Sequence, residues 1–123
     1  MSILKEKKIL IVEDEYSNYY LLKKIIESVG GDSIWVTNGR DAVDKMNDHE
    51  DIDMVLMDLK IPIMNGLEAT RDIKKNHPEK PIIAVTAYAM KSDRATALEA
   101  GCDEYVAKPL KKAQLLSKIE KLI

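Results

Sequence analysis

Lys8-Ile-Leu-Ile-Val12 is a lysine followed by four apolar residues, three of them β-branched, and two acidic residues, Glu13 and Asp14, follow it directly. Short apolar runs of this composition are typical of a buried β-strand. A second apolar run, Met54-Val-Leu-Met57, ends on another acidic residue, Asp58. The sequence therefore predicts two buried strands that both lead into carboxylates.

The rest of the chain alternates between short apolar runs and longer amphipathic stretches. The pattern predicts strands over 8–12, 33–36, 54–57, 81–85 and 104–107. It predicts helices over 15–29, 40–47, 91–100 and 110–122, and one capped by Asn65 that runs to about residue 76. Strands that alternate with helices indicate a parallel sheet covered on both faces. We therefore expect an α/β fold with a doubly wound five-stranded parallel sheet, in the order 2-1-3-4-5.

Composition and length restrict the class of protein. A chain of 123 residues fits a single domain, 1–123. The net charge of -2 argues against a nucleic-acid binder that works by neutralising phosphates. The one cysteine, Cys102, excludes an intrachain disulfide, and the chain begins without a signal peptide. No apolar run is long enough to cross a membrane, so we expect a cytoplasmic protein in a reducing compartment.

The predicted topology brings the carboxylates together. Strands one and three are neighbours in this order, roughly 5 Å apart, so Glu13, Asp14 and Asp58 would meet at one edge of the sheet. Carboxylates that lie this close repel one another, and a hard divalent cation such as Mg²⁺ relieves the repulsion. The simpler alternative is that the acidic residues after the first strand only favour the N-terminus of the next helix.

Two further residues fit the same edge of the sheet. Thr86 ends the fourth strand and Lys108 follows the fifth. A hydroxyl and an ammonium group there could bind the oxygens of a phosphoryl group on Asp58. Each residue also has a simpler explanation. Thr86 could be only a β-branched residue at the end of a strand, and Lys108 could be only a solvated lysine in a loop.

Four separated motifs resemble the receiver domain of bacterial two-component response regulators, and the resemblance covers the whole chain. The motifs are Val12-Glu13-Asp14, Met57-Asp58-Leu-Lys-Ile-Pro62-Ile-Met-Asn-Gly66, Val85-Thr86-Ala87 and Tyr105-Val-Ala-Lys108-Pro109. The fold implied is the flavodoxin-like fold of receivers. The departures, Ile61-Pro62 for Met-Pro and Asn65-Gly66 for Asp-Gly, do not touch the chemistry.

The resemblance implies a role for each matching residue. Asp58 would be the phosphoryl acceptor, and Asp14, Asp58 and the backbone carbonyl of Lys60 would bind Mg²⁺, with Mn²⁺ as a possible substitute. Glu13 would act through a metal-bound water. Thr86 and Tyr105 would form the conformational switch. Lys108 would bind the phosphoryl oxygens, and its peptide bond to Pro109 would be cis.

The resemblance also implies partners. The phosphoryl group would come from a histidine kinase or a histidine phosphotransfer protein, and an output partner would bind the face of the fourth helix, fifth strand and fifth helix. A phosphorylation-dependent dimer is a further expectation. The segment Thr86-Ala-Tyr-Ala-Met90 resembles receivers of hybrid histidine kinases, so a role as an intermediate phosphate relay stays open beside that of a switch.

Two enzyme or cofactor classes fit less well. Asp51-Ile-Asp53-Met-Val55 matches the Asp-x-Asp-x-Thr/Val signature of haloacid-dehalogenase-type phosphatases, but in those enzymes the apolar strand precedes the first Asp, whereas here it follows. A flavodoxin would need a Ser/Thr/Gly-rich phosphate loop after the first strand, and no such loop follows Val12. We therefore expect no enzyme activity beyond metal-assisted self-phosphorylation and self-dephosphorylation. Cys102, Trp35 and the Tyr19–Tyr20 pair are interpreted as packing residues.

Overall fold

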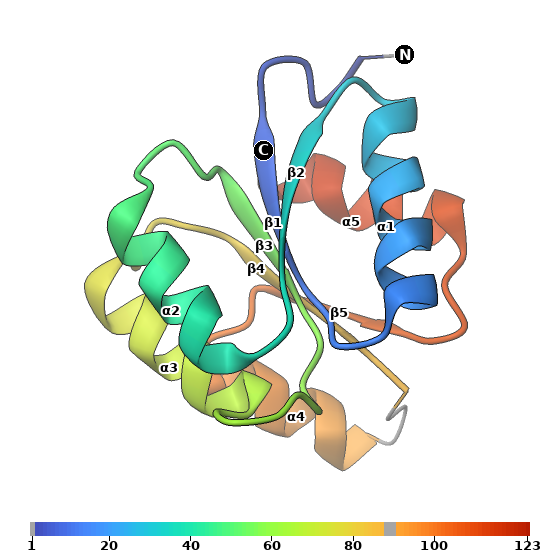
Figure 1. Ribbon diagram of the computed structural model, residues 1–123. Helices are drawn as coiled ribbons and strands as arrows, with labels where there is room; N and C mark the ends of the chain where they lie inside the picture. The colour runs from blue at the N-terminus through green and yellow to red at the C-terminus, as the bar shows by residue number, and fades with distance from the viewer. Residues whose placement is uncertain (1, 88–90) are drawn as a thin grey trace.

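The computed structural model describes residues 2–87 and 91–123, and these form one parallel sheet with helices on both sides (Figure 1). The sheet has the order β2-β1-β3-β4-β5, which confirms the predicted fold class. The strands are β1 (Lys8–Val12), β2 (Asp32–Val36), β3 (Met54–Met57), β4 (Ile82–Thr86) and β5 (Glu104–Ala107). The helices are α1 (Tyr16–Ser28), α2 (Gly39–Asp48), α3 (Gly66–Asn76), α4 (Lys91–Ala100) and α5 (Lys112–Leu122).

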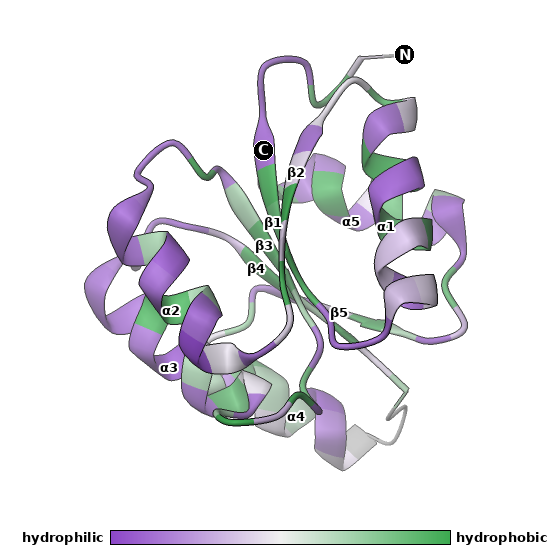
Figure 2. Cartoon of the chain, viewed as in Figure 1, coloured by the Kyte–Doolittle hydropathy of each residue, from purple (hydrophilic) through white to green (hydrophobic). Residues whose placement is uncertain are grey.

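The two faces of the sheet carry separate apolar clusters. Side chains alternate along β1, so Leu10 and Val12 pack with α2, α3 and α4, whereas Ile9 and Ile11 pack with α1 and α5. Figure 2 shows strands coloured mostly hydrophobic, between helices in which hydrophobic and hydrophilic residues are mixed. The central strands are buried on both faces and therefore read as continuous apolar runs in the sequence.

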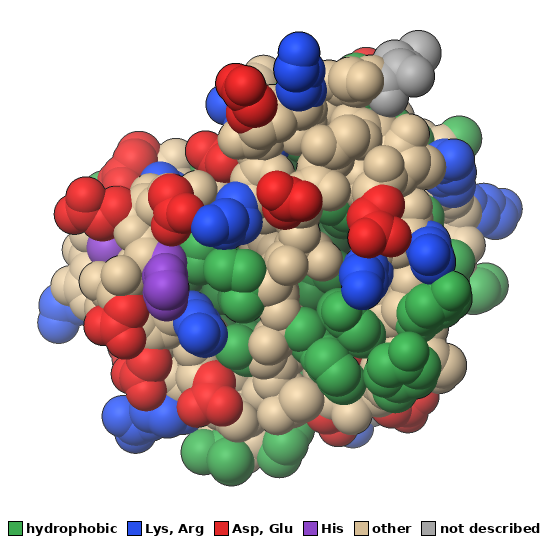
Figure 3. All heavy atoms as spheres, turned by 45° about the horizontal axis from the view of Figure 1, so that its top comes forward, with side chains coloured by type: hydrophobic (Ala, Val, Ile, Leu, Met, Phe, Trp, Pro, Cys, Tyr) green, Lys and Arg blue, Asp and Glu red, His purple; other side chains and the backbone are tan. Residues whose placement is uncertain are grey.

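Charged side chains of both signs are interspersed over the face seen in Figure 3, in keeping with the net charge of -2. None of the described helices combines the length and the apolar character that a membrane span requires.

The strand register sets which residues meet at the carboxyl edge. Val12 of β1 lies opposite Met57 of β3, and the N–H of Asp58 donates to the carbonyl of Val12 at 3.0 Å. On the other side of β3, the N–H of Lys108 donates to the carbonyl of Thr86 at 2.8 Å. The residues that follow β1, β3 and β5, together with the last residue of β4, therefore share one edge.

The bounds of β1, β3, α4 and β5 equal the predicted ranges, and those of the other elements differ by at most two residues. Asn65 caps α3 as predicted, because its side chain accepts from the N–H of Glu68 at 3.0 Å. Helix α5 begins at Lys112, since the backbone of Lys111 is extended. Strand β4 reaches Thr86, one residue further than predicted, because β5 pairs with it up to that point.

Gly66 places the loop between β3 and α3 against the end of β3. A Cβ atom at this position would lie 2.4 Å from the carbonyl oxygen of Asp58 and 2.6 Å from the Cα of Leu59. Because both are backbone atoms, the loop would have to shift. We expect Gly66→Ala to lower the free energy of unfolding by about 2–4 kcal/mol, measured by urea denaturation. A loss below about 0.5 kcal/mol would show that the loop adapts without cost.

Candidate functional site

Three carboxylates meet at the carboxyl edge of the sheet, where the sequence predicted them. Glu13 and Asp14 follow β1 and Asp58 follows β3, and one carboxylate oxygen from each lies within 4.8 Å of the others. Glu13 is only 1% exposed and Asp58 only 8%, whereas Asp14 is exposed. The cluster therefore has two buried carboxylates and one that faces outward, and oxygen donors in this arrangement suit a hard divalent cation.

Lys108 reaches into the cluster from the loop after β5. Its Nζ donates to Oε1 of Glu13 at 2.7 Å and to Oδ2 of Asp58 at 3.0 Å. Burial alone would lower the pKa of Lys108, but the hydrogen bonds to Glu13 and Asp58 outweigh it and the net shift is upward. The ammonium therefore stays charged at neutral pH. The peptide bond between Lys108 and Pro109 is cis, as the resemblance implied.

Backbone donors hold the remaining carboxylate oxygens. The N–H of Lys60 donates to Oδ1 of Asp58 at 3.0 Å, and the N–H of Glu15 donates to Oε2 of Glu13 at 3.1 Å. Burial raises the pKa of Glu13, and the bonds from Lys108 and from the N–H of Glu15 offset this only in part. Both buried carboxylates are therefore held by donors from the loops that surround them.

The cluster opens into a cavity of about 270 Å³. Thr86, which is fully buried at the end of β4, lines the same cavity as Asp58 and Lys108. The structure thus brings all but one of the predicted site residues to one place. The lining consists of Glu13, Asp14, Glu15, Asn18, Asp58, Lys60, Thr86, Ala87 and Lys108.

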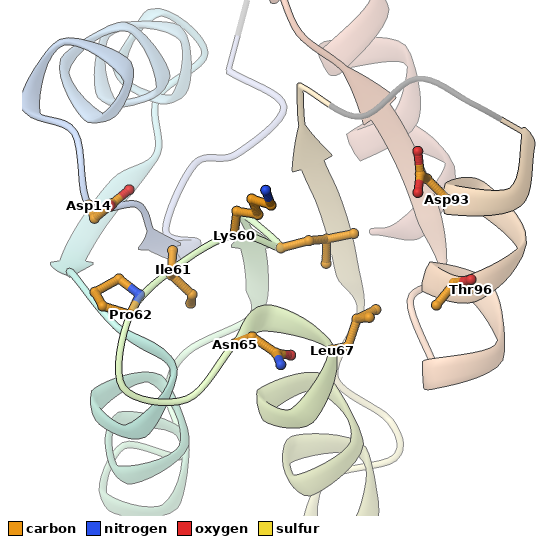
Figure 4. A pocket seen from close by; sticks show the side chains of 9 residues that line it. Asp14, Lys60, Ile61, Pro62, Asn65, Leu67, Asp93 and Thr96 are labelled. Atoms are coloured by element: carbon orange, nitrogen blue, oxygen red, sulfur yellow. The ribbon is translucent and has the colours of Figure 1, made fainter.

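A larger hollow of about 570 Å³ lies beside this cavity and shares Asp14 and Lys60 with it. Figure 4 shows Asp14 on the loop after β1, Lys60 and Pro62 on the loop after β3, and Asp93 on α4 around this hollow. Its lining also includes Leu59, Ile61, Asn65, Leu67 and Thr96. The sequence offered no sign of this hollow, because α4 contributes to it from a distant part of the chain.

Tyr105 is the one predicted site residue outside the cavity. It lies on β5 opposite Ala84 and packs against the cluster of apolar residues under α2, α3 and α4. Its Oη is buried without a hydrogen-bond partner among the described residues. Burial raises the pKa of Tyr105, and the charge of Asp93 adds to the shift.

Other residues singled out in the sequence fall away from the cluster. Cys102 is 4% exposed and contacts Thr70, and burial raises the pKa of its thiol to about 11, as expected for a packing residue and not a nucleophile. Residues 88–90, the end of the segment that resembles hybrid-kinase receivers, lie outside the described residues.

The charges of the cluster do not balance. Lys108 pairs with two of the three carboxylates, and Asp14 has no ion-pair partner within residues 2–87 and 91–123. A divalent cation would supply the missing charge and would accept the oxygen of Asp14. The residues present therefore fit Mg²⁺.

One contact at this site was not predicted. The indole Nε1–H of Trp35, on β2, donates to the backbone carbonyl of Glu13 at 2.7 Å. The sequence suggested only a packing role for Trp35, because a contact with a backbone carbonyl depends on the turn after β1 and on the rotamer of the side chain.

Comparisons with known proteins agree with this geometry. Residues 9–120 match the sequence model of the response regulator receiver domain. The polar-differentiation response regulator DivK of Brucella anthropi is 36% identical over 116 residues, which cover 93% of this chain and 94% of the relative. DivK of Brucella ovis is 35% identical over the same shares of both chains.

Solved structures show the same fold. The receiver domain of a sensor histidine kinase from Pseudomonas aeruginosa, solved with a magnesium ion coordinated in the active site cleft, is 36% identical with a TM-score of 0.87 over 94% of this chain and 96% of that one. A CheY-like receiver protein from Methanospirillum hungatei is 31% identical, with a TM-score of 0.86 over 94% and 91% of the two chains.

These similarities extend over nearly the whole length of both partners in each comparison. They agree with the parallel sheet and its strand order, and the magnesium ion in the Pseudomonas structure accords with an acidic cluster that could hold a metal. The chain belongs to the response regulator receiver family and is a phosphoryl-accepting signalling domain of two-component systems, not an enzyme in the ordinary sense.

Proposed function

We propose that Asp58 is the residue that accepts the phosphoryl group, with Mg²⁺ held by Asp14, Asp58 and the backbone carbonyl of Lys60. Glu13 lies close enough to these groups to take part through water. The observation that carries the proposal is the meeting of the three carboxylates within 4.8 Å, with Lys108 bonded to two of them. The magnesium ion in the similar Pseudomonas receiver supports the choice of metal.

The chemistry requires one bond to form and one to break. A carboxylate oxygen of Asp58 attacks the phosphorus atom of the donor, and the bond from phosphorus to the leaving group breaks, with its electron pair staying on the leaving group. The bound cation would offset negative charge on the phosphoryl oxygens. Lys108 lies 3.0 Å from Asp58 and Thr86 lines the same cavity, which supports a role for this ammonium and this hydroxyl in binding those oxygens.

Uptake from a small donor tests this function without a partner protein. With acetyl phosphate and Mg²⁺ we expect the intact mass to rise by a single phosphoryl group, with acetate as the leaving group. With chelator in place of Mg²⁺ we expect the mass to stay unchanged, because the uncompensated carboxylates repel the anionic donor. Labelling that is equally fast with chelator would contradict the role of the metal.

The conformational switch is a further part of the proposal. Phosphorylation would draw Thr86 toward the phosphoryl group and let Tyr105 reorient, which would reshape the face of α4, β5 and α5. The buried Oη of Tyr105, which has no hydrogen-bond partner in the described part of the chain, supports this, because a change of rotamer could bring it a hydrogen bond. We expect NMR shift changes on phosphorylation to extend from Asp58 to Tyr105 and α4. Changes confined to the acidic cluster would contradict the switch.

The proposed partners follow from membership of the family. A histidine kinase or a histidine phosphotransfer protein would donate the phosphoryl group in the cytoplasm. An output partner, or a second phosphorylated copy, would bind the reshaped face, where Leu98 on α4 is 42% exposed. An intermediate relay role is the second candidate, and rapid loss of label to a phosphotransfer protein would favour it.

A further inference from the structure

The turn after β1 is hydrogen-bonded to β2 through one backbone group and one side chain. The N–H of Glu13 donates to the carbonyl of Val36 at 3.1 Å, which continues the pairing of β1 with β2. The carbonyl of Glu13 accepts from the indole Nε1–H of Trp35 at 2.7 Å. Both backbone polar groups of Glu13 are thus held from β2, one by a backbone group and the other by the indole.

The bond to Trp35 sets the direction in which the chain leaves the sheet. The carbonyl of Glu13 belongs to the peptide unit that leads to Asp14, and a peptide unit is planar. Fixing this carbonyl therefore fixes the direction to the Cα of Asp14, the residue whose carboxylate must lie within 4.8 Å of those of Glu13 and Asp58.

Asp14 needs this restraint more than its neighbours do. Glu13 and Asp58 both bond to Lys108, whereas no described residue forms an ion pair with Asp14. Repulsion by two other carboxylates would push an unrestrained Asp14 outward into solvent, because its side chain is exposed. A cation would then have to pull it back and order it, at a cost in binding free energy.

The indole is itself held in place. Its ring stacks on that of Tyr19 with centroids 4.0 Å apart and an angle of 5° between the planes. The rings of Tyr16 and Trp35 form an edge-type contact, with centroids 5.9 Å apart and an angle of 61° between the planes. Trp35 is half-buried, and its contacts with the two tyrosine rings restrict the rotamer that directs its N–H to the carbonyl of Glu13.

We propose that Trp35 is a positioning residue for the metal site, which acts through the carbonyl of Glu13 to hold Asp14 in its binding position. The inference rests on the proposed magnesium site and adds a residue that makes no contact with the cation. Groups that orient metal ligands in this way contribute to metal affinity even though they do not bind the metal.

The chain contains one tryptophan, so replacement of all tryptophan is a single-site change. Growth of a tryptophan auxotroph on β-(3-benzothienyl)alanine replaces the N–H by sulfur and keeps the shape and stacking of the ring. We expect this protein, titrated with MgCl₂ in a calorimeter, to bind Mg²⁺ about 3- to 10-fold more weakly than the parent. Trp35→Phe should show a loss of the same order.

The control is Ile34→Val, which removes a methylene from the same strand on the opposite face of the sheet. It should lower the urea midpoint and leave the magnesium affinity unchanged, because Ile34 does not contact Glu13. If Trp35 had only a structural role, replacing it would change the urea midpoint in chelator but would leave the magnesium affinity unchanged.

Parental magnesium affinity in the benzothienyl protein, or an equal loss in Ile34→Val, would overturn the inference. Failure of the parent protein itself to bind Mg²⁺ would instead overturn the proposed metal site on which the inference rests.

Discussion

Asp58→Asn is expected to abolish uptake of the phosphoryl group from acetyl phosphate. An amide is not a nucleophile toward phosphorus, so the rate should fall by at least about a hundredfold, to below detection by intact mass. The substitution is nearly isosteric. Its amide oxygen can still accept the N–H of Lys60 that now donates to Oδ1 at 3.0 Å, so the loop after β3 should keep its conformation.

A matched control lies at the other end of the same strand. Asp53 precedes β3, and its Oδ2 accepts the N–H of Lys8 at 2.9 Å. Asp53→Asn makes the same chemical change just before the same strand, at the edge of the sheet away from the acidic cluster. It should take up label at the parental rate. Label that persists in Asp58→Asn would place the phosphoryl group on another carboxylate, and Glu13 and Asp14 would be the next to examine.

The fold and the meeting of the carboxylates could be predicted from the sequence because each depends on a strong local signal. Buried parallel strands read as apolar runs, and the alternation with helices predicts the strand order. Once β1 and β3 are neighbours, the residues that follow Val12 and Met57 must share an edge. The prediction of Glu13, Asp14 and Asp58 as one cluster needed nothing more than this register.

Side-chain orientation could not be predicted in the same way. Nothing in the sequence near Lys108 shows that its Nζ bonds to Glu13 and Asp58 at once, because those partners are 95 and 50 residues away. The same holds for the buried Oη of Tyr105 and for the bond from Trp35 to Glu13. These features depend on side-chain rotamers, which tertiary packing determines and which a local pattern of residues does not predict.

Removal of Asp14 should separate metal binding from folding. Mg²⁺ that binds only the native state adds RT ln(1 + [Mg²⁺]/Kd) to the free energy of unfolding, about 2–3 kcal/mol at roughly 30 to 100 times Kd. In Asp14→Ala we expect this increment to fall close to zero, because the exposed carboxylate that lacks an ion-pair partner among the described residues is gone. Urea denaturation in MgCl₂ and in chelator, at equal ionic strength, measures the increment.

The same variant should not be destabilised in chelator. Asp14 repels Glu13 and Asp58, so its removal should leave the metal-free free energy of unfolding unchanged or raise it by up to about 1 kcal/mol. The gain is small because Lys108 already pairs with the other two carboxylates. Glu15→Ala removes the same charge from the next residue, which is outside the carboxylate cluster, and should keep the magnesium increment. If the magnesium increment survives in Asp14→Ala, Asp14 is not a ligand. If the increment is lost equally in Glu15→Ala, magnesium binding depends only on the local negative charge and not on Asp14 itself.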